Sequence, residues 1–70
     1  MNNDPVYKLI ELTGTSQSSL EQAIQNAIAK ASKTVRRLSW FQVTEIRGAI
    51  KETDVSSWQV TVKIGFSVED

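Results

Sequence analysis

Three side chains suited to ligand binding lie in the second half of the chain: Trp40, Arg47 and Gln59. An indole is a flat aromatic surface on which a planar ligand can stack. A glutamine amide offers a donor and an acceptor, so it can pair with an imide-like ring edge. A guanidinium group suits a phosphate. Together these residue types would fit a flat ligand with a polar edge.

Each of these residues also has a plainer explanation. Trp40 would serve equally as an aromatic anchor at a subunit interface, and the sequence pattern alone favours that role. Gln59 alone is best explained as a solvated strand residue. For Arg47, phosphate binding and an ion pair with Glu45 or Glu69 stay equally open.

The composition excludes several kinds of chemistry. The chain of 70 residues has no cysteine and no histidine, which rules out disulfides and Ser-His or Cys-His triads and argues against a zinc site. No convergent pair of carboxylates is evident, so we expect no catalytic residues and no metal. Eight basic residues balance eight acidic ones, and no apolar run approaches a membrane span. We therefore expect a cytoplasmic protein with neither nucleic acid nor membrane as a partner.

The first half of the chain predicts a short lead-in over residues 1–5, a strand over 6–13 and a turn over 13–17. A helix should follow, with Ser18 and Glu21 at capping-box spacing. Its apolar stripe comprises Leu20, Ala23, Ile24, Ala27, Ile28, Ala31 and Val35. A basic cluster lies at its C-terminal end, where positive charge complements the helix dipole: Lys30, Lys33, Arg36 and Arg37.

The second half predicts two long strands joined by a loop over residues 51–55. The second strand begins near Leu38 and places Phe41 on the core face, so that Trp40 points the other way. A β-bulge near 44–46 would restore Ile46 and Ile50 to the core face and turn Arg47 outward, beside Gln59. The third strand alternates strictly from Trp58 to Val68.

The predicted fold is α+β, with the order β-α-β-β and a three-stranded antiparallel sheet partly wrapped around one helix. One helix covers only part of such a sheet, and a core of this size supplies about 3–5 kcal/mol. We therefore expect the subunit to function as an oligomer.

Several stretches together resemble the dodecin family over nearly the whole chain. The most telling is the helical run of residues 20–28, which is followed by residues 31–34 and then Trp40-Phe41. The others are residues 6–8, 11–12, 14–16, 47–48 with Ile50, 59–61 and 63–66.

The resemblance implies a single domain over residues 6–70 that assembles with itself into a hollow homododecamer. Dodecins bind flavins of the FMN or riboflavin type without a covalent bond, and flavin rings stack in pairs between tryptophans. By position, Trp40 is similar to that tryptophan, Gln59 to the glutamine that binds the ring edge, and Arg47 to a basic position in the ligand region. The family is thought to store flavin and quench its photochemistry rather than turn over a substrate, and some bacterial members also bind coenzyme A.

Two residues depart from the family pattern. Ser67 stands where bacterial relatives often carry an arginine, and Gln42 where they often carry a glutamate. The first change weakens the expectation of phosphate binding, and so of FMN over riboflavin. The second could alter an ion pair between subunits. A flavin-free assembly module and a shell that binds coenzyme A or a nucleotide remain as alternatives.

Overall fold

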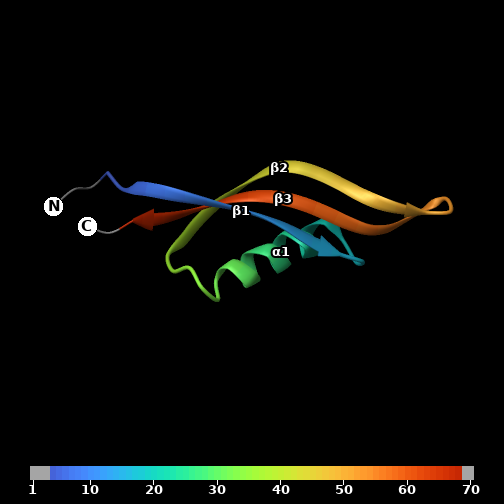
Figure 1. The fold of residues 1–70 in the computed structure, drawn as a ribbon, viewed down its shortest axis with the longest axis horizontal. Coiled ribbons are helices and arrows are strands. Elements are labelled where there is room, and N and C mark those ends of the chain that lie inside the picture. The colour runs from blue at the N-terminus through green and yellow to red at the C-terminus, as the bar shows by residue number, and fades with distance from the viewer. Residues whose placement is uncertain (1–3, 69–70) are drawn as a thin grey trace.

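The computed structural model describes residues 4–68. Its elements are β1 (Val6–Ser16), α1 (Leu20–Ala31), β2 (Leu38–Lys51) and β3 (Asp54–Val68). The sheet is antiparallel with the strand order β1-β3-β2, and α1 lies against one face of it (Figure 1). The predicted α+β fold, with a curved three-stranded sheet and one helix, is confirmed. Most of the lead-in predicted over residues 1–5 lies outside the described residues.

β1 runs three residues further than predicted, so the turn expected over residues 13–17 is wrong. Gly14 is a strand residue that pairs with Val60 and is buried under α1. A Cβ at this position would collide with the carbonyl oxygen of Ala23 and lie 3.0 Å from the Cβ of Ala27. The glycine therefore marks the close approach of strand and helix rather than a reversal of the chain.

The longer strand also moves the start of α1. Ser19, not Ser18, is the N-cap, and its Oγ accepts from the backbone N–H of Gln22 at 3.0 Å. The Ser16 hydroxyl accepts from the N–H groups of Ser18 and Ser19, which closes the tight connection. The capping box predicted for Ser18 and Glu21 is therefore wrong.

The C-terminal end of α1 comes earlier than the apolar stripe suggested. The helix ends at Ala31, so Val35 lies beyond it, and of the predicted basic cluster only Lys30 belongs to the last turn. Arg37 has a left-handed backbone, with φ of 66°, where the chain turns into β2.

The core is a thin layer between α1 and β3. It consists of the three alanines of the predicted stripe, Ala23, Ala27 and Ala31, packed against Val60, Val62 and Ile64. The alanines let the helix lie close to the sheet. Trp58 is half-buried beside this cluster.

The β2–β3 hairpin contains the predicted irregularity. The register shifts between Val43 and Glu45, so that Ile46 pairs with Val60 and Arg47 with Gln59. The predicted bulge is confirmed. The loop is shorter than the expected 51–55, because Lys51 already pairs with Asp54 and the turn is made by Glu52, with φ of 60°, and Thr53.

The subunit is elongated and leaves much apolar surface open. It measures 57 × 20 × 13 Å, and its radius of gyration is 14.6 Å, against about 11 Å for a compact domain of this length. Its accessible surface is 5402 Å², against about 4400 Å² expected for its mass. The hairpin end extends past α1 (Figure 1), where Ile46 is 54% and Ile50 is 76% exposed. Among residues 4–68, no helix is long and apolar enough to span a bilayer.

Candidate functional site

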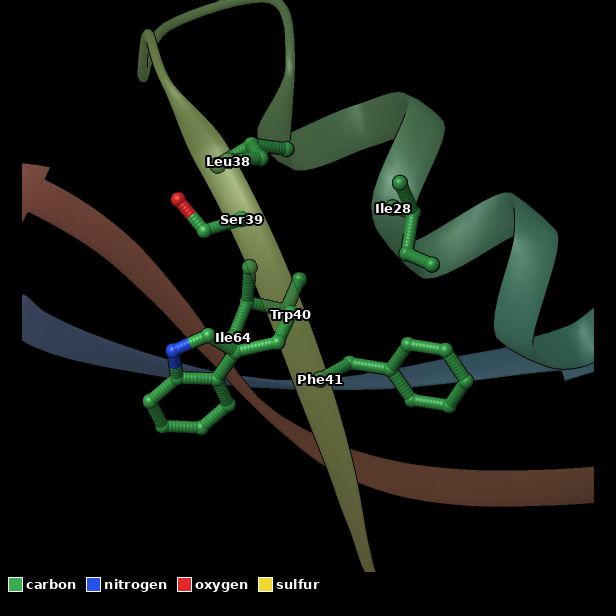
Figure 2. A pocket seen from close by; sticks show the side chains of 6 residues that line it. All are labelled: Ile28, Leu38, Ser39, Trp40, Phe41 and Ile64. Carbon is green, nitrogen blue, oxygen red and sulfur yellow. The ribbon is translucent and has the colours of Figure 1, made fainter.

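Trp40 and Phe41 lie on opposite sides of β2. Phe41 pairs with Ile64 and points to the helix side, whereas Trp40 pairs with Gly65 and points to the outer face (Figure 2). The predicted orientation of Trp40 is therefore confirmed. A second register shift, between Leu38 and Trp40, explains why Leu38 packs on the core although it has the same parity as Trp40.

The pocket at this end of β2 is too small for a flat three-ring ligand. It has a volume of about 130 Å³, whereas sites for drug-sized ligands usually enclose about 300–1,000 Å³. Its lining is almost wholly apolar and comprises Ile28, Leu38, Ser39, Trp40, Phe41 and Ile64 (Figure 2). A planar ligand would instead have to lie on the open outer face of the sheet.

Two residues support the indole from within the same subunit, and the sequence reasoning missed both. A Cβ built on Gly65 would lie 2.5 Å from Cζ2 and 2.8 Å from Cδ2 of Trp40, so the indole covers the backbone of this glycine. The ring of Tyr7 meets the indole edge-on, with centroids 5.7 Å apart and planes at 68°. An isolated glycine inside the third strand was the available signal, because glycine in a strand often marks a close approach.

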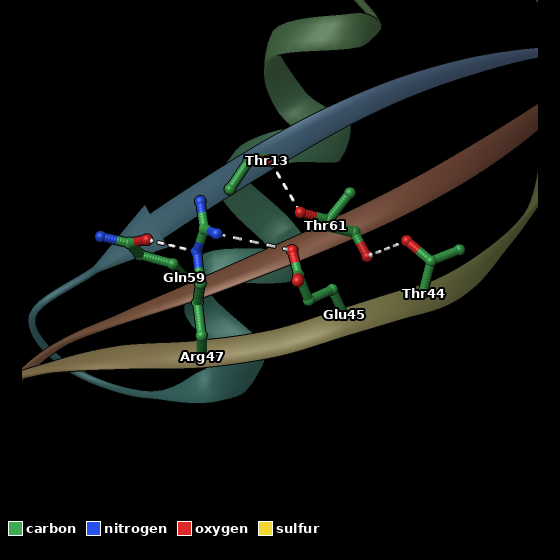
Figure 3. A network of polar contacts seen from close by, with 6 residues as sticks. All are labelled: Thr13, Thr44, Glu45, Arg47, Gln59 and Thr61. Atoms are coloured by element: carbon green, nitrogen blue, oxygen red, sulfur yellow. Dashed lines mark hydrogen bonds and ion pairs between the residues drawn. The ribbon is translucent and has the colours of Figure 1, made fainter.

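Arg47 and Gln59 form the second cluster of the outer face, as predicted. The Nε of Arg47 donates to the Oε1 of Gln59 at 2.9 Å, and its Nη1 lies 3.7 Å from the Oε1 of Glu45 (Figure 3). Of the two partners foreseen for Arg47, Glu45 is thus present, and Glu69 lies outside the described residues. Because Arg47 occupies the amide oxygen, the Gln59 amide nitrogen is the group turned toward other partners.

A threonine pair separates the two clusters along the sheet. Thr13 and Thr61 share a hydrogen bond of 2.8 Å between their hydroxyls, and Thr44 Oγ1 donates to the Thr61 carbonyl at 3.2 Å (Figure 3). Across residues 4–68, no group of three or more acidic side chains lies close enough together to hold a metal ion.

Trp40 and Gln59 are far apart within one subunit. Trp40 stands opposite Gly65, and Gln59 lies six positions before Gly65 along β3, which is about 20 Å of strand. No single flavin-sized ring system bridges that distance. The structure therefore brings Gln59 and Arg47 together but leaves Trp40 apart from them.

Comparison with known proteins identifies the family. The dodecin family model matches residues 6–69. A dodecin from Thermus thermophilus is 54% identical over 65 residues, which cover 93% of this chain and 94% of that protein. A crystal structure of a protein from the same species has a TM-score of 0.90 at 52% identity and covers 96% of this chain and 98% of its own. The dodecin of Streptomyces coelicolor has a TM-score of 0.89 at 42% identity, with 99% of both chains covered.

Proposed function

The chain belongs to the dodecin family, and from this premise we propose that it is a cytoplasmic flavin-binding protein without catalytic turnover. Twelve copies would form a hollow shell that holds FMN or riboflavin non-covalently. The shell would sequester the flavin and quench its excited state. Neither nucleic acid nor a membrane has a part in this proposal.

The observation that carries the proposal is the position of Trp40. Its indole lies over Gly65 on the face of the sheet opposite α1 and is 40% exposed. An aromatic ring held in this way is suited to stacking, and stacking on a planar base contributes about 1–3 kcal/mol. That energy corresponds to about 5- to 150-fold in affinity. Close contact between indole and flavin would also favour electron transfer that quenches the flavin.

Gln59 and Arg47 would act on the same ligand from a neighbouring subunit. The distance between Gln59 and Trp40 along the sheet supports this division, because one ring system cannot reach both within one chain. The Gln59 amide nitrogen would donate to a carbonyl on the ring edge. Arg47 would hold that amide in place through its hydrogen bond to Oε1.

The shape of the subunit supports the assembly. Its accessible surface exceeds the value for a compact chain by about 1000 Å², which is comparable to the surface that one partner buries in a standard protein interface. Much of the open apolar surface lies along the hairpin that α1 does not cover. Binding and assembly would then depend on the same contacts.

The test is size-exclusion chromatography of purified protein with detection at flavin wavelengths, followed by titration of riboflavin and FMN fluorescence. We expect quenching by the assembled protein, loss of quenching in Trp40→Ala and retention of both assembly and quenching in the matched variant Trp58→Phe. A wild-type shell that leaves both flavins unquenched would establish the flavin-free assembly module instead. If Trp40→Ala dissociates into monomers, the main role of Trp40 is in assembly.

The same titration separates flavin binding from a coenzyme A or nucleotide site. Thermal protection by coenzyme A that is lost in Arg47→Ala but kept in Trp40→Ala would favour that second kind of shell. Under the flavin proposal, Trp40→Ala is the variant with the larger loss.

A further inference from the structure

We infer that Gly65 and Tyr7 are positioning residues for flavin binding, which hold the indole of Trp40 flat on the sheet before any ligand arrives. The inference rests on the proposed flavin site and goes beyond it. It concerns residues of the same subunit, whereas the ligand itself would lie on the outer side of the indole.

Gly65 determines how closely the indole can approach the sheet. The Cδ2, Cε2 and Cζ2 atoms of Trp40 all lie within 2.8 Å of the place where a Cβ would stand on Gly65. Two of these atoms, Cδ2 and Cε2, form the ring fusion at the centre of the indole, so a tilt of the ring would not move it clear of a Cβ. Any side chain at this position would lift the ring from the backbone. The glycine is buried although it lies on the outer face, which is consistent with its being covered by the indole.

Tyr7 restricts the indole from the side. β1 and β2 both flank β3, and Leu9 is the β1 residue that pairs with Gly65. Tyr7, two residues earlier, reaches diagonally across β3 to Trp40, because Gly65 has no side chain in the way. Edge-to-face contact at 5.7 Å is a favoured aromatic geometry. Tyr7 pairs with Ser67, the residue that departs from the family pattern, and a serine there leaves room for the ring.

The two contacts leave one indole face for a ligand. The inner face lies on Gly65, one edge meets Tyr7, and 40% of the residue is exposed. A side chain that is already fixed loses little rotamer freedom on binding, which raises affinity without any new contact to the ligand.

The experiment uses assembled protein in a Trp58→Phe background, so that Trp40 is the only indole. Tyr7→Leu removes the ring, Tyr7→Phe restores it without the hydroxyl, and Gly65→Ala lifts the indole. Lys8→Ala is the control for a change next to Tyr7 in β1. Two quantities are measured for each: the near-UV circular dichroism of the indole without ligand, and the Kd for riboflavin from fluorescence quenching.

We expect Tyr7→Leu to weaken the ligand-free indole signal and to raise Kd about 2- to 12-fold, the range of one aromatic pair. Gly65→Ala should have a larger effect, while Tyr7→Phe and Lys8→Ala should match the parent. If the background protein binds riboflavin and Tyr7→Leu binds it equally well, the inference is wrong while the proposed function stands. If the background protein leaves riboflavin unquenched although Trp40 gives a strong indole signal, the proposed function is wrong, and the inference that rests on it is wrong as well. Equal indole signals in all assembled variants would also overturn the inference.

Discussion

Replacing Gly14 by alanine should destabilise the fold more than alanine at Gly48 or Gly65. The new Cβ would collide with the Ala23 carbonyl oxygen and lie 3.0 Å from the Cβ of Ala27. An ordinary contact between carbon and a carbonyl oxygen is about 3.3–3.6 Å. Strand and helix would therefore have to separate by roughly 1 Å, and a gap of that size forfeits about a quarter to a half of each packing contact.

The expected loss of unfolding free energy is large because little besides α1 covers this face of the sheet. α1 supplies the three buried alanines that pack against Val60 and Val62, so its displacement loosens the whole core cluster. Overpacking usually costs about 1–3 kcal/mol. We expect a loss at the upper end, about 3 kcal/mol, after a small gain from the reduced freedom of the unfolded chain. That is most of the stability that a core of this size supplies.

The assay is guanidinium unfolding of the assembled protein at a fixed subunit concentration, followed by far-UV circular dichroism. With a slope of about 3 kcal/mol/M, the midpoint should fall by about 1 M. Gly48→Ala is the comparison, because its Cβ would meet the Ser57 carbonyl oxygen at 2.8 Å but lies between two paired strands rather than between strand and helix. A Gly14→Ala midpoint no lower than that of Gly48→Ala would refute the idea of a rigid helix–sheet contact.

Three further predictions concern the cap, the ring-edge contact and the assembly. Ser19→Ala should cost about 1 kcal/mol of unfolding free energy, and Ser18→Ala nearly nothing; equal losses would reject Ser19 as the cap. Gln59→Leu should raise the Kd for riboflavin about 2- to 12-fold, the range of one hydrogen bond, while Arg47→Ala should do so by less; intact binding in Gln59→Leu would remove this residue from the site. Dilution below the assembly threshold should lose helical circular dichroism together with size, because the lone subunit exposes too much apolar surface; a folded monomer in analytical ultracentrifugation would contradict this.

The alternation of β3 and the apolar stripe of α1 together predicted the architecture. From Trp58 to Val68, every second residue of β3 is apolar. A shift of one residue would turn all of these side chains away from the helix, so only one pairing register buries them. The same parity argument located the bulge near Thr44 and placed Arg47 beside Gln59, and the structure confirms both.

The errors arose where local composition and tertiary contact disagree. Gly14, Thr15 and Ser16 have the composition of a turn, yet they continue β1 because Gly14 fits beneath the helix and pairs with Val60. That extension also moved the cap from Ser18 to Ser19. Such a contact depends on the distance between two elements, which no local pattern contains.

The sequence was sufficient to predict the residues of the candidate site, but not the residues that contact Trp40 and hold it in place. Trp40 was identified from its parity, whereas the contacts of Gly65 and Tyr7 with it require the strand order β1-β3-β2. Tyr7 lies 33 positions before Trp40, and only the strand between them brings the two rings together. The sequence offered an isolated glycine and an isolated tyrosine, with no pattern that links them.

The backing of Trp40 by its own sheet limits the stoichiometry of stacking. An indole with both faces open could be sandwiched between two rings, but this one rests on Gly65 and offers a single face. Under the proposed function, each subunit can therefore accept one directly stacked ring. A fluorescence titration should then saturate at no more than one tightly bound flavin per chain. A flavin enclosed on both faces must have its second face covered by a group from another copy of the chain.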